Sequence, residues 1–313
     1  MKQYLGIDLG GTNIAVGLVT EDGTLGYKDS VPTGSERGVP AVLQTMIDLC
    51  QKVLADSGVS LEEITAIGIG SPGRCDTGQG IIKYAANLGF RQVEVCKVLG
   101  EALGRPVYLA NDADCAALGE YVAGAAKGAS SSITVTLGTG LGGGVIVGDR
   151  LVNSELGHMT IQFNGELCTC GNRGCWEAYV SATALIRQAK EAAREHPRSR
   201  LALNAGGDLE RIDGKAVFDA ADQGDETARA VIVTYCRYLA IGLANLIDVL
   251  LPDVIVLGGG ISARGDEMLA PITELVREAV FGQELTTKLA IATLGNDAGI
   301  IGAALLGRGV GLQ

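Results

Sequence analysis

The chain has 313 residues, of which 47% are hydrophobic, and its formal net charge is −11 at pH 7. This length predicts about two domains or lobes with a sizeable core. The acidic balance, without any cluster of Lys and Arg, argues against nucleic acid as a partner. The longest apolar stretch, residues 239–251, is interrupted by Asn245 and Asp248 and is too short to span a bilayer, so we expect no membrane partner.

Two further features predict a soluble cytoplasmic protein. The acidic residue Asp8 comes before any apolar segment that is long enough for a secretory signal. The eight cysteines do not have the spacing of a disulfide framework, because five of them are scattered along the chain.

The first part of the chain alternates strands and helices. Residues 4–23 predict a strand, a glycine-rich turn and a second strand that ends at Asp22-Gly23. The apolar face of residues 39–57 predicts a helix closed by Gly58. The elements expected next are a strand at 65–70, a loop at 71–80, a helix at about 94–103, a strand at 106–109 and a helix of small residues to about 123.

The opening pattern then returns. Residues 131–149 again predict a strand, a glycine-rich turn and a strand. After a cysteine-rich loop, the expected elements are helices near 176–195 and 226–250, a strand at 253–257, a helix at 267–280, a strand at 288–293 and a helix at about 298–306. Two such units, each followed by strands and helices, predict a duplicated α/β architecture with the active site between two lobes.

The first glycine-rich turn is suited to phosphate. Asp8, at a strand end, is followed by Gly10, Gly11, Thr12 and Asn13. Glycine lets backbone N–H groups approach phosphate oxygens, and Thr12 and Asn13 can add donors. Asp8 is suited to Mg²⁺, which prefers oxygen ligands and substrate phosphates. For this loop alone, a plain hairpin turn is the simpler interpretation.

The second loop changes that judgement. It begins Gly138-Thr139-Gly140 and runs into a strand rather than a helix, which excludes a dinucleotide fingerprint. Neither loop is followed by Lys-Ser or Lys-Thr, which excludes a P-loop. We therefore interpret the two loops as facing hairpins that clasp the phosphates of a nucleotide. A third cluster, Gly258-Gly259-Gly260, follows a buried strand, where ligands bind in α/β sheets, and we assign it to the adenosine moiety.

The most specific signal is one histidine followed by three cysteines, at spacings of ten, two and five residues: His158, Cys168, Cys170 and Cys175. One imidazole and three thiolates make a closed, tetrahedral zinc site of the structural kind. Gly171 and Gly174 supply turns that let the sulfurs converge. The alternatives are a disulfide, which a cytosolic setting disfavours, and three unlinked thiols, which chance clustering disfavours.

Two acids flank this cluster. Glu155 lies three residues before His158, and Glu177 two residues after Cys175. A loop folded around zinc brings both carboxylates close together, and paired carboxylates accept hydrogen bonds from the hydroxyls of a neutral polyol. The alternative is that both are solvated surface acids, as most glutamates are.

These residues together resemble the ROK family of sugar kinases and repressors, within the actin/hexokinase/Hsp70 superfamily, over essentially the whole chain. The resemblance is carried by DLGGTN at 8–13, SPG at 71–73, NDAD at 111–114, GTGLGGG at 138–144, ELGH at 155–158, CTCGNRGCWE at 168–177 and LGGG at 257–260. The zinc segment is close to diagnostic for the family. Within it, the chain looks most like bacterial glucokinases, although many members carry Lys where this chain has Asn13.

The resemblance implies a two-lobed, duplicated actin-like ATPase (ribonuclease H-like) fold with the active-site cleft between the lobes. Residues 1–110 with 298–313 would form the small lobe, and residues 111–297 the large lobe. It also implies Mg²⁺, ATP and a sugar in the cleft, structural Zn²⁺, a homodimer or homotetramer, and phosphorylation of glucose at the 6-hydroxyl.

For single residues, the resemblance implies that Asp112 is the base that takes the proton of the sugar hydroxyl. The sugar contacts it implies are Gly73, Asn87, Asn111, Asp112, Glu155, His158 and Glu177. From the residues alone, a plain helix N-cap explains Asp112 nearly as well.

Other functions compete with this one. A sugar-sensing repressor of the same family would carry an N-terminal winged helix-turn-helix, and Asp8 leaves no space for one before the phosphate loop. An actin-like or Hsp70-like ATPase that moves partners does not account for the zinc loop. Within kinases, the acceptor could instead be fructose, allose, mannose or N-acetylmannosamine, and the donor polyphosphate.

Overall fold

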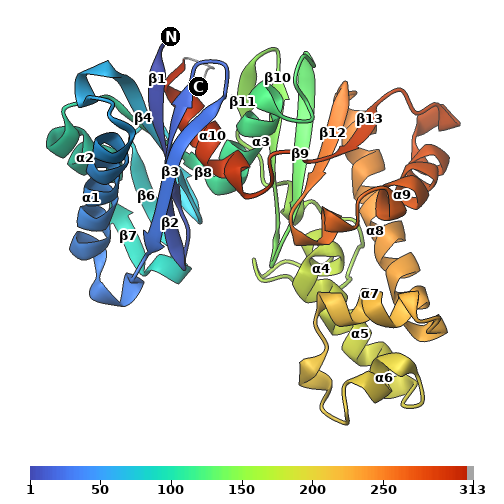
Figure 1. The fold of residues 1–313 in the computed structure, drawn as a ribbon. Helices are drawn as coiled ribbons and strands as arrows, with labels where there is room; N and C mark the ends of the chain where they lie inside the picture. The colour runs from blue at the N-terminus through green and yellow to red at the C-terminus, as the bar shows by residue number, and fades with distance from the viewer. Residues whose placement is uncertain (309–313) are drawn as a thin grey trace.

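The computed structural model describes residues 1–308, and its two halves carry sheets of the same design (Figure 1). The strand order is β3-β2-β1-β4-β8 in the first sheet and β11-β10-β9-β12-β13 in the second. In each sheet, the central strand (β1 or β9) pairs antiparallel with the next strand of the chain and parallel with a later one. The predicted duplicated α/β architecture is therefore confirmed.

The strands of the first sheet are β1 (Gln3–Leu9), β2 (Asn13–Thr20), β3 (Leu25–Pro32), β4 (Ile64–Ser71) and β8 (Val107–Asn111). Those of the second are β9 (Ser131–Leu137), β10 (Leu141–Val147), β11 (Arg150–Val152), β12 (Val254–Gly258) and β13 (Lys288–Ile291).

Long helices cover the outer face of each sheet. On the first sheet these are α1 (Val39–Ser57) and α2 (Val95–Leu103), and on the second α8 (Glu226–Leu250) and α9 (Asp266–Ala279) (Figure 1). The helix predicted at 39–57 is confirmed, and Gly58 ends it in the left-handed conformation, with a φ of 70°. Glycine adopts this conformation without the steric cost that a Cβ brings.

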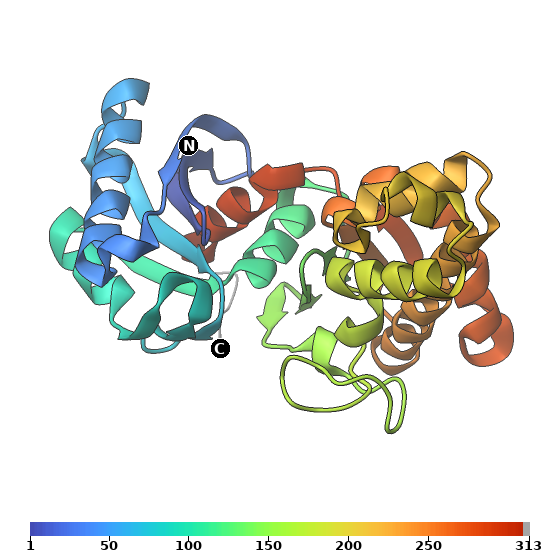
Figure 2. The ribbon, with the colours of Figure 1, turned by 90° about the horizontal axis from the view of Figure 1, so that it is seen from below.

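Two helices fill the space between the sheets, and each packs on the sheet of the other half. α3 (Asp112–Ala123) follows the last strand of the first sheet but lies on β10, where a Cβ at Gly144 would come within 2.6 Å of the Ala117 Cβ. α10 (Ala298–Leu305) follows the last strand of the second sheet but lies on β1 and β4, where a Cβ at Gly68 would come within 1.7 Å of the Ala303 oxygen. The two halves thus exchange their last described α-helices (Figure 2).

The same two helices cross each other at backbone contact. A Cβ at Gly302 of α10 would lie 1.6 Å from the Cys115 oxygen of α3, and one at Gly119 would lie 2.4 Å from the Ala298 oxygen. Glu120, which is 1% exposed, secures the crossing by accepting hydrogen bonds from the backbone N–H groups of Thr293 and Leu294. This crossing is the join between the two halves.

Several elements differ from those expected. The predicted loop at 71–80 contains β5 (Arg74–Asp76), which joins β6 (Ile81–Ala85) and β7 (Phe90–Val93) in a small third sheet. The helix expected at 176–195 is broken at Ser181 into α4 (Glu177–Val180) and α5 (Ala182–Glu195), because the Ser181 hydroxyl accepts from the Ala184 N–H as an N-cap.

Two helices between 196 and 225 were not expected, namely α6 (Arg200–Asn204) and α7 (Gly214–Asp222). The predicted lobe boundaries at residues 110 and 298 stay a prediction. The end of the predicted small lobe at 309–313 lies outside the described residues.

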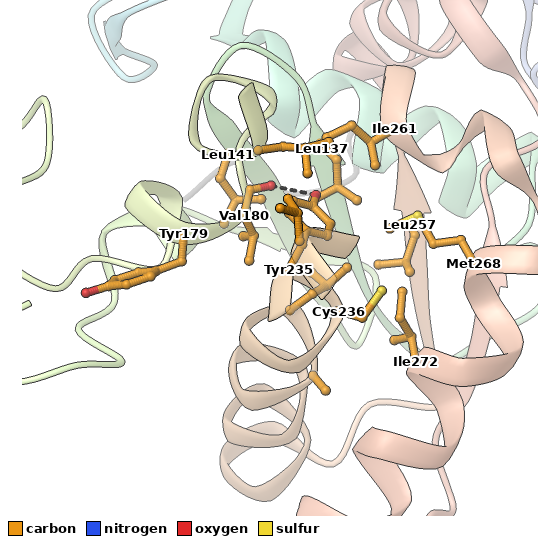
Figure 3. Close-up of a cluster of buried hydrophobic side chains, with 14 of the residues drawn as sticks. Leu137, Leu141, Tyr179, Val180, Tyr235, Cys236, Leu257, Ile261, Met268 and Ile272 are labelled. Carbon is orange, nitrogen blue, oxygen red and sulfur yellow. Dashed lines mark hydrogen bonds between the residues drawn. The ribbon is translucent and has the colours of Figure 1, made fainter. Parts of the chain in front are cut away.

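The core of the second half is built around α8. Figure 3 shows Tyr235 of this helix among the side chains of Leu137, Leu141 and Val180, with its hydroxyl donating to the Val180 oxygen at 2.7 Å. Among residues 1–308, α8 is the one helix that is long and apolar enough to cross a membrane. Of its most apolar 18-residue stretch, 56% is buried inside the protein. We therefore interpret α8 as a core helix.

Candidate functional site

A cleft of about 830 Å³ lies between the two sheets, and both halves of the chain line it. The first half supplies Asp8, Gly73, Arg74 and Asn87. The start of α3 and the second half supply Asn111, Asp112, Thr136, Gly138, Thr139, Gly140, Glu155, His158 and Glu177, among others. Eleven of the residues predicted for sugar, phosphate or magnesium therefore share one cavity.

The junction of β8 and α3 places Asn111 and Asp112 at the cleft. The Asn111 carboxamide caps α3 by accepting from the Ala113 N–H at 2.9 Å, and it donates to the Gly73 oxygen at 3.1 Å. The N-cap position thus belongs to Asn111, and Asp112 is the first residue of the helix. Solvent reaches Asp112 through the cleft. The protein around the carboxylate still removes part of its hydration, and this burial raises the pKa of Asp112 above the ordinary value.

Asp8 is the second-last residue of β1 and lines the cleft from the first half of the chain. Burial, followed by the charge of Asp112, raises the pKa of Asp8 to about 6. A Cβ at Gly299, in the first turn of α10, would lie 3.2 Å from an Asp8 oxygen, so that helix approaches the carboxylate closely. Two carboxylates that repel each other across a cleft form a site at which a hard cation would be favourable.

The first glycine loop is a tight turn beside the cleft rather than part of its lining. The Gly10 N–H donates to the Asn13 oxygen at 2.9 Å, and a Cβ at Gly11 would lie 2.9 Å from the Asn87 Nδ2. Of the residues that the structure describes, Gly10 to Asn13 are not among those that line the 830 Å³ cavity, whereas their neighbours Asp8 and Asn87 are.

The Glu177 carboxylate holds the second glycine loop in place through a hydrogen bond to its backbone. One Glu177 oxygen accepts from the Leu141 N–H at 2.9 Å, and the other accepts from the Thr169 hydroxyl at 2.9 Å. This carboxylate therefore joins the loop 138–141 to the cysteine-rich segment. Both Glu155 and Glu177 line the cleft, but within residues 1–308 only the Glu177 side chain accepts hydrogen bonds from the protein.

The third glycine cluster, assigned to adenosine, does not line this cavity in the described part of the chain. Gly258 ends β12, and Gly259 has a φ of 87° and lies against β9, where a Cβ would come within 2.4 Å of the Leu137 oxygen. Gly260 begins a short 3-10 helix, and a Cβ added at this position would have no atom within 4 Å. The cluster is adjacent to the start of the second loop, and its role stays a prediction.

The predicted convergence of four metal ligands is confirmed. The ligand atoms of His158, Cys168, Cys170 and Cys175 all lie within 4.8 Å of one another. The Cys168 sulfur is 3.6 Å from the His158 Nδ1, and the sulfurs of Cys170 and Cys175 are 3.6 Å apart. Metal–ligand bonds of about 2.0–2.3 Å in a tetrahedral zinc site place ligand atoms about 3.5–3.8 Å apart, so this donor set fits zinc.

Backbone turns bring these ligands together as expected. Gly171 and Gly174 have φ values of 92° and 81°, and a Cβ at Gly174 would lie 1.7 Å from the Gln162 oxygen. Trp176, which is fully buried, anchors the end of the segment to α8, where its ring fills the space left by Gly242 and its N–H donates to the Tyr238 oxygen at 3.0 Å. The metal cluster is thus fixed to the core of the second half.

The structure adds two residues that motif analysis did not place in the site. Arg74 is the one Lys or Arg among the described residues that line the cleft. Asp114 lines a side pocket of about 400 Å³ that shares Gly73, Asn111 and Glu155 with the cleft. The motif at 111–114 contained a signal for Asp114, whereas nothing in the sequence distinguished Arg74 from other exposed cations.

Comparison with known proteins identifies relatives over the whole length. The sequence profile of the ROK family matches residues 4–309. A glucokinase from Halalkalibacterium halodurans is 37% identical over 97% of this chain and 94% of its own. A xylose repressor from Caldicellulosiruptor bescii is 28% identical, and the match covers 95% of this chain and 76% of the repressor.

Two solved structures agree with this family and with the fold. A ROK family glucokinase from Streptomyces griseus, in complex with glucose and AMPPNP, has a TM-score of 0.80 and 34% identity, covering 98% of this chain and 99% of its own. A ROK hexokinase from Thermus thermophilus has a TM-score of 0.84 and 36% identity, with 97% of both chains covered. The mixed α/β architecture with two five-stranded sheets is accordingly the actin-like ATPase fold.

Proposed function

Because the chain belongs to the ROK family, we propose that it is a kinase that transfers the γ-phosphoryl group of ATP to the 6-hydroxyl of glucose. The observation that carries this proposal is that one cleft is lined by Asp112, the loop 138–140, Glu155 and His158. The Streptomyces griseus glucokinase, whose complex contains glucose and a nucleotide analogue, supports the same assignment.

Asp112 is the proposed general base. A sugar hydroxyl is a poor nucleophile, so a carboxylate that takes its proton as the oxygen bonds to phosphorus lowers the barrier, while the bond to the bridging oxygen of ADP breaks. The raised pKa of Asp112, caused mainly by burial, makes it a stronger base than a solvated aspartate. Since Asn111 already caps α3, the capping role that competed for Asp112 is filled by its neighbour.

The charges of the cleft bear on how the nucleotide binds. Four carboxylates, those of Asp8, Asp112, Glu155 and Glu177, and one guanidinium, that of Arg74, line it. A triphosphate therefore meets a net negative wall, and backbone N–H groups of the glycine loops have to supply most of the protein's donors. Asp8 is the residue that would hold Mg²⁺, which neutralises phosphate charge when bound.

The sugar would occupy the end of the cleft bounded by Gly73, Asn87, Asn111, Glu155 and His158. The Glu155 carboxylate is exposed to the cleft and can accept hydrogen bonds from sugar hydroxyls. Glu177 already accepts from Leu141 and Thr169, so we propose that it acts mainly by holding the second glycine loop in place beside the sugar.

We also propose structural Zn²⁺ at His158, Cys168, Cys170 and Cys175, because four protein ligands leave no open position for chemistry. Adenosine binding at 258–260, the division into a small lobe (1–110 with 298–313) and a large lobe (111–297), a cytoplasmic location and a homodimer or homotetramer complete the proposal.

A coupled assay of ADP formation tests it, with glucose, fructose, allose, mannose and N-acetylmannosamine as acceptors and ATP or polyphosphate as donor. We expect glucose with ATP to give the highest kcat/KM. A higher value for another hexose would refute the assignment to glucose, and sugar binding without any phosphate transfer would favour a regulator.

Asp112→Asn tests the mechanism. The amide keeps the shape but cannot take the proton, so kcat should fall by roughly 10²–10⁴-fold, the usual size of general-base assistance. Asp48→Asn, on the exposed face of α1, is the matched control. Near-normal turnover of a folded Asp112→Asn protein would remove this residue from the chemistry.

A further inference from the structure

Asp114 is a buried acid that lacks the hydrogen bonds such a group needs. It lies in the first turn of α3, and the residue is 6% exposed. Its Oδ1 atom is inaccessible to solvent and has no hydrogen-bond partner among the residues that the structure describes. An ionised carboxylate buried without donors is strongly disfavoured, whereas nearly all buried polar groups in proteins are paired.

The side pocket beside Asp114 contains polar side chains, among them Asn153 and Ser154, but none of the described residues donates a hydrogen bond to the Asp114 Oδ1. The backbone of β10 lies directly against it, since a Cβ at Gly144 would be 3.2 Å from the Asp114 Oδ1. Cys75 and Arg74 face the same side pocket from β5, and Glu155 faces it from the loop before His158. No ion pair joins Arg74 to Asp114 in residues 1–308.

The charge environment of Asp114 favours its neutral form. Burial, then the charge of Glu155 and then that of Asp112, raises the pKa of Asp114 to about 7. Cys115 on the same helix and Cys75 on β5 also have raised pKa values, mainly because of burial, so neither supplies a compensating charge. A neutral carboxylic acid differs from its neighbours Asp112 and Glu155 because it has an O–H group to donate.

We propose that Asp114 works as a neutral carboxylic acid that donates a hydrogen bond to Glu155 and so positions the Glu155 carboxylate for the acceptor sugar. The inference rests on the proposed function, because it assumes that Glu155 contacts the sugar. The two side chains line one pocket that opens into the cleft. With one Glu155 oxygen held by Asp114, the other remains free to accept from a sugar hydroxyl.

This role makes sugar affinity depend on pH. If only the neutral form of Asp114 holds Glu155 in place, affinity falls as pH rises through the pKa of about 7. Between pH 6 and pH 8.5, the neutral fraction of such a group falls by about 30-fold, which sets the largest expected increase in the glucose Kd. Asn at position 114 keeps a donor and cannot lose it, so the variant should bind glucose with nearly the same Kd at both pH values.

The experiment is calorimetric titration of the zinc-loaded, full-length protein with glucose at pH 6, 7, 8 and 8.5, without nucleotide or Mg²⁺. The variants are Asp114→Asn, which retains a donor, and Asp114→Ala, which removes it. Asp48→Asn is the control, because Asp48 is an exposed acid on α1 that does not line the cleft. Zinc content is measured at each pH so that loss of metal is not mistaken for the effect.

We expect the glucose Kd of the wild type and of Asp48→Asn to rise by about 10- to 30-fold over this range, and that of Asp114→Asn to change by less than about threefold. Asp114→Ala should bind glucose weakly at every pH. A wild type with no pH dependence, or an Asp114→Asn variant with the wild-type slope, overturns the inference while leaving the kinase proposal intact. A wild type that binds no hexose at any pH refutes the proposed function and this inference together.

Discussion

Gly302→Ala tests the join between the two halves. The substitution adds one methyl group to α10, and its Cβ would lie 1.6 Å from the Cys115 oxygen and 2.8 Å from the Gly119 nitrogen of α3. A carbon and an oxygen atom in contact are normally about 3.3–3.6 Å apart. The two helices must therefore separate by roughly 1.7 Å or more, which also loosens the packing of both helices on the sheets.

Overpacking a core with an extra methylene usually costs about 1–3 kcal/mol, and a clash with rigid backbone belongs at or above the upper end. For a protein of this size, each 1 kcal/mol lowers the Tm by roughly 2–4 °C. We therefore expect Gly302→Ala to lower the Tm by about 6–12 °C. The kcat should fall as well, because α3 begins at Asp112 and α10 begins beside Asp8.

Gly100→Ala is the matched control, since Gly100 is also inside a helix. A Cβ there would meet the Arg105 oxygen at 3.5 Å and the Val107 Cγ2 at 3.7 Å, which are ordinary contacts. Replacing an unconstrained helix glycine by alanine should stabilise the protein by about 0.5–1 kcal/mol. Thermal unfolding followed by circular dichroism compares the two variants. Equal Tm values would show that the crossing is not as close as the structure indicates.

Three further predictions concern the cleft. Cys170→Ser should lower zinc to less than one per chain by elemental analysis and raise the glucose KM; full activity with substoichiometric zinc would contradict this. Glu177→Ala should cost about 1–3 kcal/mol of stability because it leaves the Leu141 N–H unsatisfied. Glu177→Gln should cost less, because the amide can accept from the Leu141 N–H and donate to the Thr169 hydroxyl. Equal losses of Tm in the two variants would argue against the hydrogen bonds that join Leu141 and Thr169 through Glu177. The free energy of unfolding of Asp114→Asn relative to the wild type should rise by up to about 2 kcal/mol from pH 5.5 to pH 8. The reason is that a pKa raised from 3.8 to about 7 makes ionisation of Asp114 in the folded wild type increasingly costly as pH rises. A difference in stability that does not depend on pH would contradict this prediction.

The features that local chemistry determines could be predicted from the sequence. The helix closed by Gly58 and the two strand–glycine–strand units follow from short-range patterns of apolar residues and glycine. The metal cluster could be predicted because three cysteines and a histidine at short spacing have few other uses.

Other elements left no such pattern. β3 is an edge strand whose residues are mostly exposed or half-buried, so it lacks the apolar alternation of a core strand. The small sheet of β5, β6 and β7 is made of strands of three to five residues, too short for periodicity to be read.

The site itself depended on contacts between distant segments. The hydrogen bond from the Leu141 N–H to the Glu177 carboxylate could not be predicted from the sequence. The two residues are 36 positions apart and meet only once β10 and the cysteine-rich segment have folded. The isolation of Asp114 likewise arises because α3 packs on the glycine-lined face of β10, which offers backbone but no donor side chain at that point.

The exchange of helices between the halves has a consequence for synthesis on the ribosome. Tyr4, Val19 and Ala66 of the first sheet share one buried cluster with Ile300 and Ala304 of α10. These first-sheet residues leave the ribosome long before α10 does, so one apolar face of the first sheet waits uncovered until nearly the whole chain has been made. A nascent chain arrested before residue 298 should therefore expose that face to chaperones, even though its own strands and its outer helices α1 and α2 are already complete.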